Sequence, residues 1–498
     1  MKKYLSILLI CCLVLTAVPV LGTGDAAVAP KYVFMFIGDG MGNPQVTATQ
    51  YYIGSLENPD APMPTPEQLS FTDFSNLGMV TTYDATSFCP DSASTATSMA
   101  SGEKTLSGVI NYDVDKTKAF KPITEYAKEA GMEVGIITSV SLDHATPAAY
   151  YAKVESRKQY YDIAVQGLTN DTLDFFGGGG FLNPDGKSTN KDTGETTMQE
   201  NLFDIAAANG WTFVNSNEEI RSLNAESDRV LAISPILQDS QSLTYEIDRV
   251  RMESEGADVL SLADFVTAGI NVLDNDNGFF MMCEGGKIDW SCHANDAATS
   301  ILETIAFSDA VQVAVDFAAE HPEETLIIVT ADHETGGMTI GFATTAYDTH
   351  FAYLANQTIS YTEFDKVIST LRDNGASFED ALVEIEKYYG LTTKEEQDLT
   401  LTEDELAKIQ AAYELSMQNK DERVLGEKEE FLYGGYEPLS MAVSHIINNK
   451  AGLSYTSYSH TGLQIPVYAT GVGSEVFGGL YDNTDIFFRT MQAMGLSQ

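Results

Sequence analysis

The sequence predicts an α/β fold in which helices flank a central, mostly parallel sheet. Short apolar runs that end in an acidic or hydroxyl residue beside a glycine or turn indicate strands buried on both faces. Helical patterns separate these runs, and this alternation is typical of a parallel sheet covered by helices. The clearest apolar runs are residues 32–37, 134–138, 278–283 and 325–330, and the clearest helical patterns are residues 123–130 and 301–319.

Residues 336–455 are richer in helix formers and acidic side chains, as in residues 402–418. We interpret this segment as a helical, acidic insertion, a crown-like subdomain near the mouth of the active site. The core is then discontinuous, comprising residues 23–335 and 456–498, and it closes with a strand over 464–470 and a helix over 485–494.

Four consecutive glycines at 177–180 are expected to form a turn. No Lys-Ser/Thr pair follows them, so they do not match a phosphate-binding loop.

The first residues have the pattern of a secretory signal peptide. A basic start at Lys2 and Lys3 precedes an apolar run over 4–21, which ends in small residues at 22–24. We predict a signal peptide over residues 1–22 and prefer it to an uncleaved membrane anchor, because no basic cluster follows the run. The protein is therefore expected to be secreted or periplasmic, with no stable membrane span once the leader is removed.

Charge and cysteine content exclude other classes of protein. The chain has 28 basic and 72 acidic side chains and a formal charge of -44, which disfavours a nucleic-acid-binding surface. Three cysteines lie beyond the leader, and this odd number argues against a disulfide framework. Cys283 and Cys292 are expected either to pair or to pack as buried free thiols.

Acidic and imidazole side chains gather where the predicted strands end. Ligands of a parallel sheet bind at the carboxyl ends of its strands, so these side chains are expected to converge. Asp289 and His293 are four residues apart and share one face of a helical turn. Carboxylates mixed with imidazoles suit zinc, whereas carboxylates with a threonine oxygen suit magnesium. The candidate ligands of this kind are Asp39, Glu284, Asp289, His293, Asp332, His333 and His460.

The candidate nucleophile is Ser92, which follows Pro90 and Asp91 at the predicted start of a helix of small residues. Free N–H groups and the helix dipole favour a phosphate there. In the alternative interpretation, Asp91 and Ser92 only cap the helix. A serine hydroxyl is a poor nucleophile at its ordinary pKa, and metal coordination is the activator available to Ser92.

Together these motifs resemble the alkaline phosphatase family, from residue 32 to about 496. The resemblance implies hydrolysis of phosphate monoesters through a phosphoserine at Ser92, with Arg157 binding phosphate bidentately and Asp91 orienting Arg157. The motifs occur in the family's order at residues 38–42, 91–93, 144–147, 156–158, 284–293, 330–333 and 460–462.

The same resemblance implies two zinc sites, a third site that usually takes magnesium, and a homodimer. His144 and Trp290 stand where some members carry Asp and Lys, near the phosphate, and His144 opens the third site to zinc or cobalt. The implied ligands are Asp289, His293 and His460 for the first zinc, Asp39, Asp332, His333 and the Ser92 oxygen for the second, and Asp39, His144, Thr146 and Glu284 for the third site.

Two other functions stay open. A phosphodiesterase of the same wider fold typically uses a threonine nucleophile and lacks the third metal site. Ser92, Arg157, Thr146 and Glu284 together therefore favour monoesters. A secreted metal-binding protein without catalysis would bind zinc and show no turnover. Sulfatases are disfavoured, since residues 92–96 do not form their Cys/Ser-x-Pro-x-Arg motif.

Overall fold

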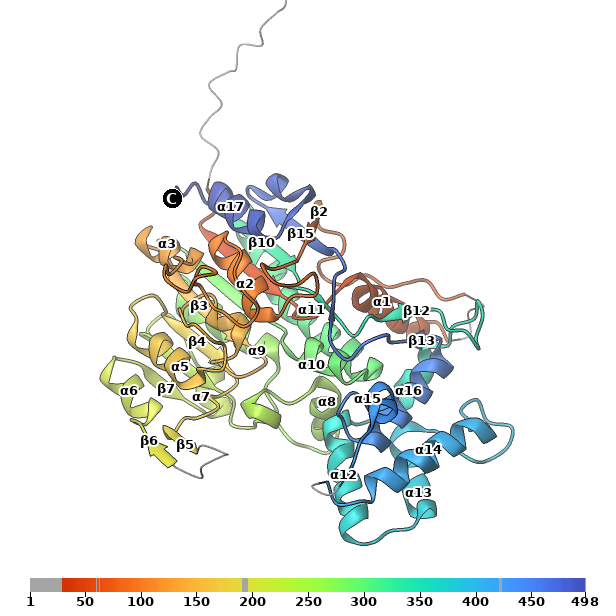
Figure 1. Cartoon of the computed structure of the whole chain (residues 1–498). Coiled ribbons are helices and arrows are strands. Elements are labelled where there is room, and N and C mark those ends of the chain that lie inside the picture. Colours follow the sequence, from red (N-terminus) through yellow and green to blue (C-terminus); the bar gives the residue numbers. More distant parts are fainter. Residues whose placement is uncertain (1–28, 60, 62, 190–195, 421–422, 498) are drawn as a thin grey trace, which may run out of the picture.

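The computed structural model describes residues 29–59, 61, 63–189, 196–420 and 423–497 (Figure 1). The predicted signal peptide over residues 1–22 lies outside this part. Within the described residues, no helix combines the length and apolar character needed to cross a membrane.

One sheet of ten strands forms the centre of the molecule, and most of its strands are parallel, as predicted. Strand β1 (Tyr32–Ile37) lies between β9 (Phe279–Glu284) and β10 (Thr325–Thr330), and every residue of these three strands is buried. The antiparallel exception is β15 (Ile465–Gly471), which pairs with β10 and β2. The other strands are β2 (Asn76–Thr81), β3 (Glu133–Thr138), β4 (Phe175–Gly178), β7 (Thr212–Val214), β8 (Val230–Ile233) and β16 (Gly479–Asp482).

Helices cover both faces of this sheet, which confirms the predicted α/β class (Figure 1). On one face α9 (Leu262–Leu273) packs against α11 (Ala297–Glu320), and on the other α2 (Ser92–Ser101) packs against α17 (Thr484–Ala493). The remaining helices of the core are α1 (Asn43–Glu57), α3 (Ile123–Glu129), α4 (Ala145–Ala148), α5 (Tyr160–Thr169), α6 (Leu202–Ala208), α7 (Asn217–Arg221), α8 (Glu246–Ser254) and α10 (Lys287–His293).

The four glycines at 177–180 do not form the predicted turn, because Gly177 and Gly178 belong to strand β4. A Cβ on Gly178, whose φ is +124°, would lie 1.9 Å from the carbonyl oxygen of Thr138. A Cβ on Gly179 would lie 2.1 Å from the carbonyl oxygen of Val140. The glycines are therefore needed because a neighbouring backbone passes close to them. In the sequence, glycines required for this reason look the same as glycines that form a turn.

Residues 336–455 are largely helical and lie at one end of the core (Figure 1). Their hydrophobic cluster also includes Tyr52 of α1 and Ile301 of α11, so the segment packs on the core. We propose that it is an insertion with the boundaries given above. Among its described residues, the helices are the 3-10 helix η2 (Phe351–Asn356), α12 (Tyr361–Asp373), α13 (Phe378–Tyr389), α14 (Glu403–Ser416), α15 (Glu427–Tyr433) and α16 (Pro438–Ala451).

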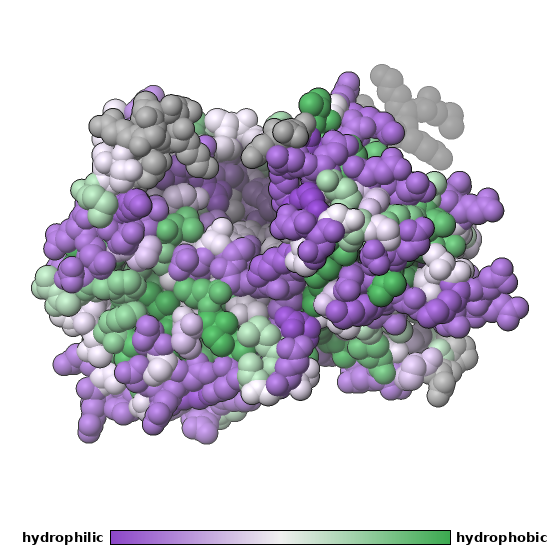
Figure 2. All heavy atoms as spheres, turned by 90° about the horizontal axis from the view of Figure 1, so that it is seen from below, coloured by the Kyte–Doolittle hydropathy of each residue, from purple (hydrophilic) through white to green (hydrophobic). Residues whose placement is uncertain are grey.

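A hollow separates the helical segment from the edge of the core on the face seen in Figure 2, where most side chains are hydrophilic. A cavity of about 420 Å³ lies between Arg251 of α8 and Lys366 of α12. The hydrophilic character of this face agrees with the large negative charge of the chain.

Replacing Asp365 by asparagine is expected to stabilise the helical segment at alkaline pH. Burial, and more weakly the Glu437 carboxylate, raise the pKa of Asp365 from 3.8 to about 6, against a hydrogen bond from Ser440. Because the pKa is raised on folding, the cost of ionising Asp365 is absent below about pH 4 and complete above about pH 6. Urea unfolding of Asp365→Asn should therefore show a gain of about 1 to 2 kcal/mol at pH 8 that shrinks towards pH 5.

The same change at Asp398, which is exposed, is the matched control and should give no such pH-dependent gain. An equal gain for Asp365→Asn at pH 5 and pH 8 would contradict the prediction.

Candidate active site

The carboxyl ends of the three central strands bring the predicted ligands together. Strands β1 and β9 are parallel, with Ile37 aligned to Glu284, and β1 and β10 are parallel, with Ile37 aligned to Thr330. Asp39 and Asp332 each follow their strand by two residues. The carboxylates of these strands therefore lie at one edge of the sheet.

Three groups of side chains at this edge have ligand atoms within 4.8 Å of one another. Asp39 belongs to two of the groups, so the groups adjoin. Every predicted carboxylate and imidazole ligand falls in one of them. The groups are Asp289 with His293 and His460, Asp39 with Asp332 and His333, and Asp39 with His144 and Glu284.

The first group joins α10 to the short strand β14 (His460–Thr461). Asp289 Oδ1 lies 3.3 Å from His293 Nε2 and 3.5 Å from His460 Nε2. Each imidazole has its Nδ1 at a backbone carbonyl oxygen, 2.6 Å from that of Tyr458 for His293 and 2.5 Å from that of Pro90 for His460. A carbonyl only accepts hydrogen bonds, so Nδ1 carries the proton and Nε2 has a lone pair for a metal.

The second group is fully buried beneath the candidate nucleophile. His333 Nε2 lies 3.2 Å from Asp332 Oδ2 and 3.5 Å from Asp39 Oδ1. Burial lowers the pKa of His333 well below its ordinary value, which keeps the imidazole neutral. Ser92 Oγ is 3.3 Å from the same Nε2 atom, so the serine oxygen faces this group.

The third group includes the predicted threonine. Thr146, on the one-turn helix α4, lies with its Oγ1 3.5 Å from Asp39 Oδ2. Glu284 accepts a hydrogen bond from Thr138 of β3, and burial raises the pKa of Glu284 to about 8. Burial, and then the Arg157 guanidinium, lower the pKa of His144 to about 3, so His144 is a neutral donor.

The residues of these groups fit divalent cations. Within the described part of the chain, the buried atoms Asp39 Oδ1, Glu284 Oε1 and His144 Nδ1 have no hydrogen-bond partner. Burial, followed by the charges of Asp332 and Asp289, raises the pKa of Asp39 well above its ordinary value. Buried carboxylates that lie this close together, with so few hydrogen-bond donors around them, require a positive charge between them. Carboxylate oxygens and imidazole nitrogens are ligands for zinc and magnesium.

The nucleophile candidate begins helix α2. Ser92 is buried, and Asp91 caps the helix, because its side chain accepts a hydrogen bond of 3.1 Å from the Ser94 N–H. Asp91 Oδ2 also accepts from Arg157 Nη1 at 3.0 Å. Asp91 therefore caps the helix and, through the other oxygen of its carboxylate, also contacts the arginine.

His144 and Trp290 stand beside this arginine. Arg157 Nη2 lies 3.3 Å from His144 Nε2, and the rings of His144 and Trp290 are 5.7 Å apart and close to perpendicular. The structure therefore brings together all the residues that the sequence placed at the phosphate: Ser92, Asp91, Arg157, His144 and Trp290.

Comparison with known proteins identifies the family. A family model for alkaline phosphatase matches residues 30–496. The chain belongs to the alkaline phosphatase family. It is 29% identical to alkaline phosphatase 3 of Bacillus subtilis (strain 168), over 93% of this chain and 89% of that protein, and 29% identical to alkaline phosphatase 4, over 91% and 87%.

Solved structures of alkaline phosphatases agree with this fold. A cold-active enzyme from Shewanella sp. is 27% identical, with a TM-score of 0.73 over 93% of this chain and 99% of that chain. The enzyme of Thermus thermophilus is 23% identical, with a TM-score of 0.76 over 94% and 92%. The chain is therefore a phosphatase of a metal-dependent family.

Sequence reasoning missed three polar residues that organise the alkaline phosphatase site. Asp84 is buried and accepts hydrogen bonds from the Ser87 N–H and the Ser94 hydroxyl, so it shapes the loop before Ser92. Thr335 donates to Asp289 Oδ1 at 2.5 Å. Lys287 is fully buried at the start of α10. Of these three residues, only Lys287 could have been noticed in the sequence, because it is the single lysine or arginine in the 284–293 motif.

The cysteines do not form a disulfide within the described residues. Cys283 in β9 and Cys292 in α10 are buried free thiols, and Cys89 is an exposed one. The free-thiol alternative for Cys283 and Cys292 is confirmed.

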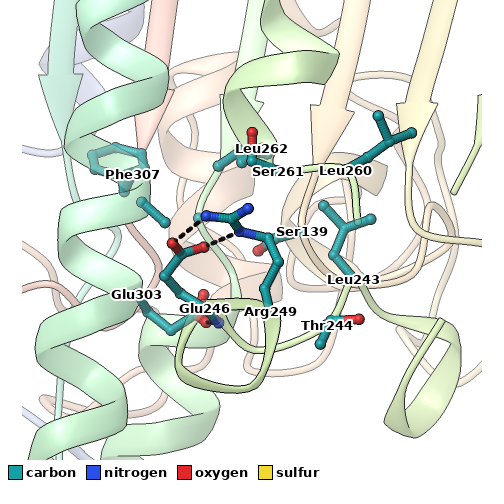
Figure 3. Close-up of a pocket in the computed structure, with 12 residues that line it drawn as sticks. Ser139, Leu243, Thr244, Glu246, Arg249, Leu260, Ser261, Leu262, Glu303 and Phe307 are labelled. Atoms are coloured by element: carbon teal, nitrogen blue, oxygen red, sulfur yellow. Dashed lines mark hydrogen bonds and ion pairs between the residues drawn. The ribbon is translucent and has the colours of Figure 1, made fainter. Parts of the chain in front are cut away.

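A small cavity between α8 and α11, beside Gly285, is not the active site (Figure 3). It is lined by Ser139, Arg249 and Glu303, and its volume of about 20 Å³ leaves room for a single water molecule. A phosphate ester does not fit there.

Proposed function

We propose that this alkaline phosphatase hydrolyses phosphate monoesters to inorganic phosphate and an alcohol through a phosphoserine at Ser92. One observation carries the proposal. The Ser92 oxygen, at the start of α2, faces the Asp39–Asp332–His333 group, and Arg157 is held beside the same helix by Asp91. Nucleophile, cation ligands and a phosphate-binding guanidinium therefore meet in one place.

We propose the metal assignment that the family resemblance implies. When bound, such cations lower the pKa of a coordinated hydroxyl or water and stabilise a leaving oxygen. Asp289, His293 and His460 would hold one zinc, Asp39, Asp332, His333 and the Ser92 oxygen a second, and Asp39, His144, Thr146 and Glu284 a magnesium, or zinc or cobalt in its place.

The chain's own residues then perform three tasks. Ser92 Oγ attacks phosphorus and forms a new P–O bond, while the bond to the alcohol breaks and the alcohol leaves. Arg157 donates two N–H groups to non-bridging oxygens, and Asp91 holds the guanidinium plane for this contact. Water then attacks the phosphoserine, which releases inorganic phosphate and restores the Ser92 hydroxyl.

The choice of monoesters over diesters depends on the third group. A monoester has three non-bridging oxygens to neutralise, and a cation held by the Asp39–His144–Glu284 group next to Arg157 would add positive charge for them. The test compares 4-nitrophenyl phosphate with bis(4-nitrophenyl) phosphate, with zinc and magnesium present. We expect the monoester to react at least about 100-fold faster by kcat/KM, which is about 2.7 kcal/mol of transition-state preference.

Each alternative has its own result in this test. A faster reaction of the diester would make the protein a phosphodiesterase. Tight zinc binding without turnover of either ester would make it a metal-binding protein.

Trp290→Lys is expected to be inhibited by inorganic phosphate about fivefold more tightly than Trp290→Met, which also lacks the ring but adds no charge. Trp290 adds no charge beside His144, and an ammonium there would contribute about 1 kcal/mol to binding of the phosphate dianion. Slower product release should accompany the tighter binding. The measurement is the phosphate inhibition constant, with Trp290→Met as an uncharged control, and equal constants for the two variants would count against the prediction.

We also propose export, with removal of residues 1–22, and a homodimer. N-terminal sequencing of the mature secreted protein tests the first proposal. Sedimentation at micromolar concentration tests the second, since a monomer would contradict it.

A further inference from the structure

The side chain of Lys287 is enclosed by the loop over residues 238–246. Its Nζ lies 2.8 Å from the Leu243 carbonyl oxygen, 2.9 Å from Ser242 Oγ and 3.2 Å from both Asp239 Oδ1 and Gln238 Oε1. A fully buried ammonium is costly without such partners. These contacts therefore join the start of α10 to the loop.

Two aromatic rings complete the surroundings of this ammonium. Its Nζ lies 3.3 Å from the centroid of the Tyr245 ring and 5.8 Å from that of Trp290. A cation attracts the face of an aromatic ring, more strongly when it is desolvated. Lys287 thus contacts both the loop and the tryptophan that is three residues further along α10.

The loop over residues 238–246 contains an unfavourable backbone conformation, which contacts with its surroundings must stabilise. Ser240 and Gln241 are consecutive non-glycine residues with φ of 48° and 62°, in the left-handed region. The Gln241 carbonyl accepts from the Gly180 N–H at 2.8 Å, and the Leu243 N–H donates to the Ser139 carbonyl at 2.8 Å. Figure 3 shows Leu243 and Ser139 on neighbouring segments. The loop is anchored to the core on one side and to Lys287 on the other.

A continuous set of contacts leads from Lys287 to the phosphate-binding arginine. Lys287 approaches the Trp290 ring at 5.8 Å, the Trp290 ring meets the His144 ring at 5.7 Å, and His144 Nε2 lies 3.3 Å from Arg157 Nη2. Arg157 has a second, independent anchor in Asp91. Lys287 is therefore linked, through the Trp290 ring, to one of the two groups that contact the guanidinium.

We propose that Lys287 is a positioning residue for phosphate binding, which acts by holding the Trp290 ring against His144 and, through it, Arg157. The inference rests on the proposed function and deepens it. It assigns a role in phosphate binding to a residue that does not belong to the three metal-ligand groups.

The test uses Lys287→Met and Lys287→Arg in a Trp211→Phe background, where Trp290 is the single tryptophan, since the chain has two. Lys287→Met should weaken phosphate inhibition and raise KM about tenfold, with kcat changed less than about threefold, because ground-state anchoring is lost. Acrylamide should quench Trp290 emission more efficiently in this variant. Bound zinc should be unchanged, and Lys287→Arg should recover most of the phosphate affinity.

Two further variants make the test decisive. Asp239→Ala removes one partner of the ammonium from the partly exposed side of the loop, and should show the same changes to a smaller extent even where Lys287→Met does not fold. Lys366→Met removes an exposed lysine of α12 and should change none of these measurements.

The inference would be overturned if phosphate inhibition and quenching were both unchanged in folded Lys287→Met or in Asp239→Ala. It would also be overturned if Lys287→Met weakened phosphate inhibition only because the variant had lost zinc. Wild-type protein without turnover would instead refute the proposed function. Quenching and equilibrium phosphate binding would still report on Lys287 in that case.

Discussion

Ser92→Ala is expected to lower kcat for 4-nitrophenyl phosphate by about four orders of magnitude or more. The variant keeps Arg157 and the three ligand groups, so it should still bind phosphate. It lacks the oxygen that forms the covalent bond, and water would have to attack the ester directly. The measurement is steady-state turnover together with acid quenching of the enzyme in the presence of labelled substrate, which should trap phosphoserine in the wild type alone.

Ser98→Ala is the matched control for this substitution. Ser98 is a buried serine on the same helix, and its hydroxyl donates to the Ser94 carbonyl and not towards the metal groups. Its turnover should stay within about threefold of the wild type, as expected for loss of one neutral hydrogen bond. Near wild-type turnover of Ser92→Ala would rule out the covalent route.

Removal of divalent cations is expected to abolish turnover and to lower thermal stability. Without cations, buried carboxylates such as Asp39, Asp332 and Glu284 repel one another in a site that lacks donors for all their oxygens. A cation present at about a thousandfold excess over its dissociation constant contributes about 4 kcal/mol of stability. In a chain of this length that corresponds to a fall in melting temperature of about 5 °C for each site emptied.

Activity and melting temperature should be measured after chelation and again after addition of zinc, magnesium or both. Zinc should restore most of the turnover, and magnesium or cobalt should restore the remainder through the third group. Asp332→Asn should retain less zinc than the wild type and gain little from its addition. Full turnover in chelator would contradict both the cation requirement and the proposed activation of Ser92.

Parts of the fold with strong local signals were predictable from the sequence. The strands Tyr32–Ile37 and Thr325–Thr330 have the predicted bounds, because runs buried on both faces must be apolar throughout. The helix that carries Asp289 and His293 was predictable from their four-residue spacing. The start of α2 at Ser92 followed from Asp91, whose side chain caps the helix.

Other features depend on groups that are distant in the sequence. Gly177 and Gly178 were predicted as a turn, since nothing near them indicates that the Thr138 backbone passes within contact distance. Asp84 has no local signal in the sequence, yet it is buried and accepts a hydrogen bond from the Ser87 N–H of the loop before Ser92. The contacts of Lys287 come from a loop more than forty residues earlier in the chain.

By itself, the sequence predicted the α/β class, the ends of β1 and β10 and the side chains whose types can bind a metal or act as a nucleophile, because periodicity and side-chain type are local properties. The tertiary structure alone decided which of these groups face one another. His460 lies beside Asp289, and Ser92 lies beside His333, because the fold brings together segments that are far apart in the sequence. The same packing decided that a lysine is enclosed beside Trp290, since burial and contact depend on segments that no local pattern brings together.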